Sequence, residues 1–452
     1  MASLPSSPIP VLRGRFTEAH ATRLLWRAGF GPRPGEAAAL ARAGLDAAVA
    51  SLTRPSGQAR LIGARPHDDK GNPLDPINVW GHDHCWWLDR MVRSDQQLVE
   101  RMTLVWHSWF ATSLDASTAA LMLRQNAMMR RHALGNFHAL LLEVTRDPAM
   151  LLWLSGTENT KYSPNENYGR EVMELFTLGA DRGAYSQHDV HEQARALTGF
   201  TNDWNPSGPS NFRFDPTLHD QGVKRVFGHR GRFDWRDSCR LCVGHPLHPT
   251  FMVAKLWGYF IPGAPPPREL RTLARLYRTS GYEVRPLLEA ILRHPRFYTG
   301  PRMVIPPAVY CAGLLRALGR TIETDAWSWI GAQAGQRLFE PPNVAGWDYG
   351  HWLDTSRWAG RFTAVTYALQ GHVLDTSASS YSAHETAAEA VRTALEYWGN
   401  PRLSSSTVKN LTAFSHRAQA GIAAGWEQVT YRILRQNALR GLIPTTPEWQ
   451  TC

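Results

Sequence analysis

The sequence has few cysteines and no long apolar run. Its five cysteines, Cys85, Cys239, Cys242, Cys311 and Cys452, are too few and too scattered for a disulfide framework in a chain of 452 residues. No stretch approaches the ~18 consecutive apolar residues that a membrane-spanning helix needs. Residues 1–30 also lack the apolar core of a secretion signal. We therefore expect a cytoplasmic protein with no membrane partner.

Blocks of like charge are also missing. The net charge of +10 comes mainly from scattered arginines, and no run of five or six basic residues occurs. Without such a run or a basic–aromatic alternation, nucleic acid is not expected as a partner. A small anionic molecule is compatible with the basic balance. The absence of a glycine-rich phosphate loop means that no nucleotide cofactor is indicated.

Tryptophan, by contrast, is abundant. The chain has 18 tryptophans, and several stand beside polar residues, as in Trp106-His107 and Gly346-Trp347-Asp348. Indole rings fill hydrophobic cores, which is the main expectation, and they also line ligand pockets. Trp347 is therefore a candidate wall of a substrate site.

Helical periodicity dominates the chain. We predict an all-α fold, a large bundle-like array of helices with a small β-hairpin in an insertion at about 200–235. The hairpin is predicted because Phe200-Thr201-Asn202 and Phe212-Arg213-Phe214 flank a turn-forming segment. A main domain over 1–375 and a C-terminal helical segment over 383–452, packed on it, are expected on either side of a linker at 376–382. Helices are expected over 17–28, 34–52, 78–93, 95–112, 116–134, 136–146, 164–179, 186–199, 234–243, 247–260, 267–279, 284–293, 304–318, 321–333 and 355–371, with about three more before residue 440.

A helix hairpin at 164–199 is the feature with the clearest boundaries. Ser163 followed by Pro164 is a typical helix start, with the serine as N-cap and the proline at the first helical position. Ser186 and Asp189 form the sequence pattern of a capping box for the second helix. The connection at 180–187 is short, so we expect the two helices to pack side by side.

Both helices carry charged stripes. Glu171 and Glu174 lie one turn apart and share a face with Asn167. Glu192 and Arg195 form a similar stripe on the second helix. Facing carboxylates can bind a metal or act as an acid–base pair. An Arg–Glu network at a helix interface accounts for the same residues and stays open as the alternative.

Two further segments add chemistry to this hairpin. Glu100 and His107 lie seven residues apart and therefore on one helix face. The loop at 219–224 brings a base, an acid and a cation within six residues.

The candidate catalytic residues are Glu171, Glu174, Glu192, His219, Asp220 and Lys224. The candidate substrate-binding residues are Asn165, Asn167, Arg170, Arg195 and Trp347. The candidate ligands of iron, manganese or zinc are Glu100, His107, Glu171 and Glu174.

A string of sulfur and imidazole side chains lies outside the hairpin. Cys239, Cys242, His245 and His248 follow one another at three-residue steps, which resembles a zinc ligand set. The two cysteines also fit a buried helix face, where a thiol acts as a small apolar group. Both interpretations stay open.

Several segments, in matching order from Arg23 to Ala364, resemble a known bacterial family. They are Arg131–Phe137, Asn165–Gly179, Ala194–Gly199, Phe214–Lys224, Lys255–Trp257 and Phe339–Trp347. Together they identify the chain as similar to the domain of unknown function 1800 family, whose name assigns no activity. Most of the candidate acid–base residues fall inside these segments, whereas Glu192 lies just outside them. The resemblance also implies an apolar environment for Cys239 and Cys242.

From these patterns we expect an enzyme. Its helix-borne carboxylates would bind a metal or act as an acid–base pair in the oxidation of a small organic substrate. A hydrolase or transferase for a glycan or other polar polymer, using paired carboxylates, is the first alternative. A non-catalytic binding scaffold and a terpene-cyclase-like enzyme are the others. The sequence does not indicate the substrate or the oligomeric state.

Overall fold

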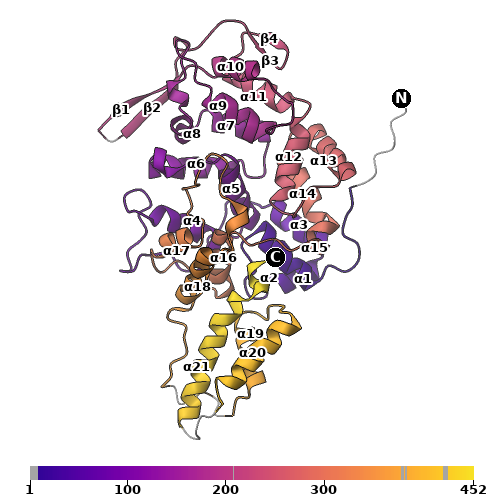
Figure 1. Ribbon diagram of the computed structural model, residues 1–452, viewed down its shortest axis with the longest axis vertical. Helices are drawn as coiled ribbons and strands as arrows, with labels where there is room; N and C mark the ends of the chain where they lie inside the picture. Colours follow the sequence, from indigo (N-terminus) through magenta and orange to yellow (C-terminus); the bar gives the residue numbers. More distant parts are fainter. Residues whose placement is uncertain (1–8, 207, 378–380, 382–383, 421–425) are drawn as a thin grey trace.

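The computed structural model describes residues 9–206, 208–377, 381, 384–420 and 426–452. The fold is mostly α-helical with two small antiparallel sheets, which confirms the predicted fold class (Figure 1). The helices of the first half are α1 (Glu18–Ala28), α2 (Glu36–Ala43), α3 (Leu45–Thr53), α4 (His82–Arg93), α5 (Gln97–Trp109), α6 (Ala119–Arg131), α7 (Phe137–Thr145), α8 (Pro148–Trp153), α9 (Asn167–Glu171), the π-helix η3 (Val172–Thr177) and α10 (Gln187–Ala196). The helices of the second half are α11 (Trp235–Gly244), α12 (His248–Gly258), α13 (Pro267–Thr279), α14 (Val284–Arg293), α15 (Pro295–Thr299), α16 (Pro307–Ala317), α17 (Trp327–Gln333), α18 (Thr355–Leu369), α19 (Ala387–Tyr397), α20 (Ser405–Arg417), α21 (Trp426–Leu442) and α22 (Pro447–Gln450). Short 3-10 turns lie at Leu114–Ala116, Gly156–Glu158, Tyr349–His351 and Ile443–Thr445.

Two hydrophobic clusters form the core, and α5 contributes to both. Met102 and Trp106 of α5 pack into the first cluster, with side chains from α1, α7 and α11 to α14. Leu104 of the same helix packs into the second cluster, with α4, α16 and α18. The C-terminal helices α19 to α21, at the lower end of Figure 1, bury Ala390 and Leu439 in this second cluster. The helix α5 therefore lies between the two packed halves of the molecule.

Most predicted helix boundaries agree with the structure. The helices α13 and α14 have the predicted bounds, because proline at the start of α13 favours the first helical position and both helices are strongly amphipathic. The predicted helix at 34–52 is instead divided into α2 and α3 at Gly44, whose φ of 84° interrupts the helix. The predicted linker at 376–382 lies partly outside the described residues.

The predicted start of the first hairpin helix is wrong. Ser163 pairs with Thr160 in a bridge, and α9 begins only at Asn167. The backbone N–H of Asn165 donates to the side-chain oxygen of Asn159 at 2.9 Å, which holds this segment outside the helix. The helix then continues as the π-helix η3, in which Leu178 N–H donates to the carbonyl of Met173, five residues earlier. After residue 172 the side chains therefore point in directions that differ from those expected for an α-helix.

The second hairpin helix and the β-hairpin follow the predictions. Ser186 and Asp189 form a capping box at the start of α10. The helices α9 and α10 pack closely because Gly169 has no side chain. A Cβ atom there would lie 3.1 Å from the backbone nitrogen of Ala194. Strands β1 (Phe200–Asn205) and β2 (Gly208–Phe214) pair antiparallel, and the sequence did not reveal a second pair, β3 (Lys224–Val226) and β4 (His229–Gly231).

Candidate functional site

Arg195 lies at the centre of a closed set of ion pairs. Its Nε is 2.7 Å from Asp220 Oδ2, and its Nη1 is 2.8 Å from Glu192 Oε1. The other Glu192 oxygen accepts from the backbone N–H of Arg225 at 2.7 Å. Burial raises the pKa of Asp220, but the hydrogen bonds from Arg195 and Gly222 outweigh it, so this pKa lies below its ordinary value. These charges neutralise one another and attach the 219–226 segment to α10.

Lys224 and His219 complete the same cluster. Buried Lys224 donates through Nζ to the backbone carbonyls of Asp220 and Gly222. His219 Nδ1 lies 2.9 Å from the carbonyl oxygen of Thr198, and burial is the main reason that the pKa of this imidazole is lowered. The structure thus brings Glu192, Arg195, His219, Asp220 and Lys224 together. Their polar groups form hydrogen bonds and ion pairs with one another and with the adjacent backbone.

Glu171 and Glu174 are separate from that network. Burial, and then the charge of Glu174, raises the pKa of Glu171. Glu174 accepts a hydrogen bond from the hydroxyl of Tyr185 at 3.2 Å. Arg170 does not pair with Glu174. It pairs with Glu166 at 3.0 Å and donates to Gln187 at 3.1 Å.

Asn165 and Asn167 are used in the turn that starts α9. The side-chain oxygen of Asn165 accepts from the backbone N–H of Asn167 at 2.9 Å. The two asparagines therefore fix the backbone before the helix. Neither asparagine side chain makes a hydrogen bond to Glu171 or Glu174 in the described part of the chain.

The four candidate metal ligands are not gathered at one point. Glu100 is fully buried and pairs with Arg130 at 2.7 Å and with Arg90 at 3.1 Å. Within the described part of the chain, no three His, Cys, Asp or Glu side chains are placed to hold a metal ion. Glu100, His107, Glu171 and Glu174, as placed here, do not form a common set of metal ligands.

His107 lies among aromatic rings. Its ring centroid is 5.2 Å from that of Trp87, 5.7 Å from Phe339 and 5.5 Å from Trp347. Burial lowers the pKa of His107 to about 3, so the imidazole is neutral. Trp347 is only 6% exposed and packs on this histidine instead of lining an open site.

The cysteine–histidine string belongs to the core. The Cys239 sulfur lies 3.1 Å from Thr145 Oγ1, and Gln193 donates to the Cys242 sulfur at 3.2 Å. His248 is buried and hydrogen-bonds to the carbonyl of Thr177 and the hydroxyl of Tyr277. The four side chains have different partners, which agrees with the buried-face interpretation of the two cysteines.

A groove of about 650 Å³ lies between β2 and the helices α6 to α8 and α11. We call it the arginine groove. Its charged lining residues are Arg124, Arg131, Glu143, Arg146, Asp147, Arg213 and Arg236. Apolar parts of its wall come from Phe200, Phe212 and Trp235. Five guanidinium groups therefore face two carboxylates, and the groove carries an excess of positive charge.

Three of the five arginines are already paired. Arg146 pairs with Glu143 at 2.6 Å, while Arg213 and Arg236 pair with aspartates outside the groove. Arg124 and Arg131 are exposed and make no ion pair or hydrogen bond with any residue that the structure describes. These two guanidinium groups are available to an anionic ligand.

Asp147 is a buried carboxyl in the wall of this groove. It is 5% exposed, and burial raises its pKa to about 6. Its Oδ1 accepts from Gln125 at 2.7 Å and from the backbone of Met150 at 3.1 Å. The backbone N–H of Ala149 and the charge of Arg124 also favour the ionised carboxyl, but burial outweighs them. In the sequence, Asp147-Pro148 indicates only a helix start, so Asp147 does not stand out as a candidate there.

The structure describes no helix long and apolar enough to cross a membrane. Comparison with curated proteins finds no match, and comparison with solved structures finds none either. The family model described as "Protein of unknown function (DUF1800)" matches residues 23–451. This match confirms the resemblance seen in the sequence and extends it through the C-terminal helices. The chain belongs to the DUF1800 family.

Proposed function

We propose that this protein is an enzyme that binds an anionic organic substrate in the arginine groove and uses Asp147 to transfer a proton. The observation that carries this proposal is the placement of a carboxyl with a pKa of about 6 in the wall of a positively charged groove. A group that exchanges its proton near neutral pH, in a cleft, is a typical acid–base catalyst.

The arginines supply the binding energy in this proposal. A guanidinium group presents a planar set of N–H donors that matches the oxygens of a carboxylate, sulfate or phosphate. Arg124 and Arg131 make no ion pair or hydrogen bond with a described residue, so a ligand that binds them displaces neither. The aromatic side chains of Phe212 and Trp235 would contact the apolar part of an organic anion.

Asp147 supplies the proton-transfer step. The two hydrogen bonds to Oδ1 fix the orientation of the carboxyl in the wall of the groove. At pH 7 a carboxyl with a pKa of about 6 is mostly ionised. It therefore acts first as a base, taking a proton from the substrate or from a water molecule.

The test compares binding with turnover. Purified protein is screened with organic carboxylates, sulfates and phosphate esters by thermal shift, and each binder is then followed by NMR for conversion. Asp147→Asn retains the Oδ1 acceptor, so we expect ligand affinity to change less than threefold and turnover to fall about a hundredfold or more. Wild-type turnover should rise with pH through about 6. Full turnover by Asp147→Asn would contradict the proposal.

An acidic glycan is a second candidate substrate. Glu143 lies in the same groove as Asp147, so two carboxylates are available, as in most glycoside hydrolases. Glu143→Gln should abolish cleavage of an acidic oligosaccharide if this candidate is correct. If Glu143→Gln leaves turnover of the substrate unchanged, Asp147 acts alone and the glycosidase version is excluded.

We also propose a cytoplasmic location. All five cysteines are free thiols, and four of them are buried, which suits a reducing compartment. Fractionation of the cells that produce the protein, with blotting of each fraction, tests this proposal.

A further inference from the structure

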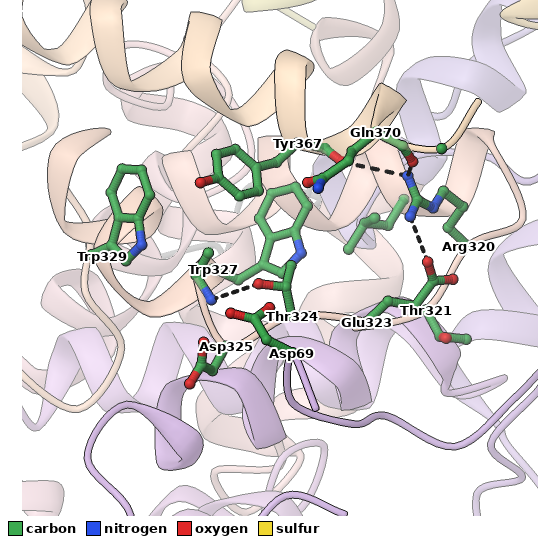
Figure 2. A pocket seen from close by; sticks show the side chains of 13 residues that line it. Asp69, Arg320, Thr321, Glu323, Thr324, Asp325, Trp327, Trp329, Tyr367 and Gln370 are labelled. Atoms are coloured by element: carbon green, nitrogen blue, oxygen red, sulfur yellow. Dashed lines mark hydrogen bonds and ion pairs between the residues drawn. The ribbon is translucent and has the colours of Figure 1, made fainter. Parts of the chain in front are cut away.

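A second concave site lies at the opposite side of the α5 core, between α17, the end of α18 and the loop before α17 (Figure 2). It is a pocket of about 550 Å³, which we call the tryptophan pocket. Its aromatic lining residues are Trp327, Trp329 and Tyr367. Its polar lining residues are Asp69, Arg320, Thr321, Glu323, Thr324, Asp325 and Gln370. None of these residues belongs to the arginine groove.

The frame of the pocket is fixed by Arg320. This side chain donates to the carbonyls of Ala368 at 2.6 Å and Gln370 at 2.8 Å, at the C-terminal end of α18. It also pairs with Glu323 at 2.5 Å. Both charges are therefore occupied within the protein, and they hold the 320–326 loop against α18 before any ligand arrives.

An aromatic platform forms one side of the pocket. The rings of Trp329 and Tyr367 meet edge to face, with centroids 5.6 Å apart and planes at 88°. Trp329 is 40% exposed, so a large part of its indole is open to a ligand. Figure 2 shows these two rings and the indole of Trp327 on one side in this view and the carboxylates of Asp69 and Asp325 on the other.

Polar groups without partners line the same cavity. Trp327 is 2% exposed, yet its indole N–H makes no hydrogen bond to any described residue. The carboxylate of Asp69 is likewise without a hydrogen bond or ion pair in the described chain. The side chain of Asp325 has only a distant contact, 3.7 Å from Nε2 of His82. One indole N–H donor and two carboxylate acceptors are thus left for a ligand.

We propose that the tryptophan pocket binds a neutral saccharide unit. Sugar hydroxyls both donate and accept, so they satisfy the carboxylates of Asp69 and Asp325 together with the N–H of Trp327. The apolar face of a pyranose ring covers the exposed indole of Trp329. An anion is disfavoured by the carboxylates, and an organic cation offers no acceptor to the Trp327 N–H. The proposal stands independently of the reaction in the arginine groove.

The test measures saccharide binding to the full chain. The probes are glucose, mannose, galactose, N-acetylglucosamine, maltose, cellobiose and chitobiose, followed by saturation-transfer NMR and then by calorimetry. We expect at least one probe to bind. Trp329→Ala should weaken that binding about tenfold or more, and Asp325→Asn should weaken it about fivefold. Trp204→Ala is the matched control, because Trp204 is 71% exposed on β1, outside the pocket.

The possible outcomes are distinct. A loss of binding with Trp329→Ala and Asp325→Asn, but not with Trp204→Ala, supports the proposal. An unchanged melting temperature of each variant shows that the fold is intact, and Asp69→Asn, at an exposed position, provides a second variant. Absence of binding to the whole panel overturns the proposal. Binding of choline or putrescine in place of every sugar, with the same loss in Trp329→Ala, also overturns it, since the ligand is then an organic cation.

Discussion

The arginine groove and the tryptophan pocket are of similar size and have opposite chemistry. The groove, about 650 Å³, has five arginines and two carboxylates, while the pocket, about 550 Å³, has three carboxylates and one arginine. In the pocket the single arginine is paired, and carboxylates are left over. In the groove it is arginines that are left over. The net charge of +10 therefore does not predict the charge that either site presents to a ligand. Ion pairs within each site decide which charged groups remain free to contact a ligand.

The largest expected difference between the two sites concerns catalysis. We expect Asp147→Asn to reduce turnover about a hundredfold or more while saccharide binding in the tryptophan pocket is unchanged. Measurement of both properties on one preparation checks this expectation. A parallel loss of both would mean that the variant disturbs the fold instead of one site.

The next effect is on stability. The pKa of Asp147 is about 6 in the folded state and 3.8 in its ordinary range, so the folded protein holds this proton more tightly than the unfolded chain. Stability from this group is present below pH 3.8 and is lost as the pH rises through about 6, a change of about 3 kcal/mol. Asp147→Asn does not titrate. Urea unfolding at pH 4 and pH 7.5 should therefore show the variant gaining about 2.5 kcal/mol relative to the wild type, since pH 4 already lies just above 3.8. An unchanged difference would contradict the raised pKa.

Substitution of the unpaired arginines should have a smaller effect, on the affinity for the anionic ligand. Arg124→Gln and Arg131→Gln should each weaken an anionic ligand of the groove about tenfold, because a charge-assisted hydrogen bond contributes about 1.5 kcal/mol. Calorimetry with a ligand from the anion screen measures this change. Arg230→Gln is the matched control, since Arg230 is exposed on β4 and does not line the groove. Equal losses for all three variants would indicate a general charge effect.

The smallest expected difference between the two sites is the effect of salt on ligand affinity. The screening length falls from about 10 Å at 0.1 M to about 3 Å at 1 M ionic strength. We expect affinity for the anion to fall severalfold over this range and affinity for the saccharide to change less than twofold. Titrations at both salt concentrations check the difference, and equal salt dependence would argue against an uncharged ligand in the tryptophan pocket.

The charged hairpin shows why sequence patterns located residues but not their roles. Glu192 and Arg195 are three residues apart and pair as helical spacing predicts. Arg195 also pairs with Asp220, which lies 25 residues later and is brought near only by the packing of the 219–226 segment on α10. This pairing holds the loop on α10, and the catalytic role of these residues stays a prediction.

Glu100 and Asp147 also show that a sequence pattern does not reveal the surroundings of a carboxylate. Glu100 was predicted to bind a metal, whereas Asp147 was not predicted to have a functional role. Glu100 was a candidate metal ligand, but its carboxylate meets Arg130, 30 residues away on α6, and is neutralised there. In the sequence, Asp147 indicates only a helix cap. Tertiary packing buries this residue in the wall of a groove and raises its pKa. A carboxylate's reactivity depends on burial and on neighbouring charges, and neither is visible in local spacing.

The sequence by itself determined the helical class, the β-hairpin, the Ser186 cap and the family. These features depend on contacts between residues close together in the chain, on apolar periodicity and on backbone preference. Only the tertiary structure decided the π-helix at Val172–Thr177, the pairing of Glu100, the burial of Asp147 and the assembly of both cavities. Those features arise where distant segments meet, because the free energy of a charged or aromatic side chain is set by what packs against it.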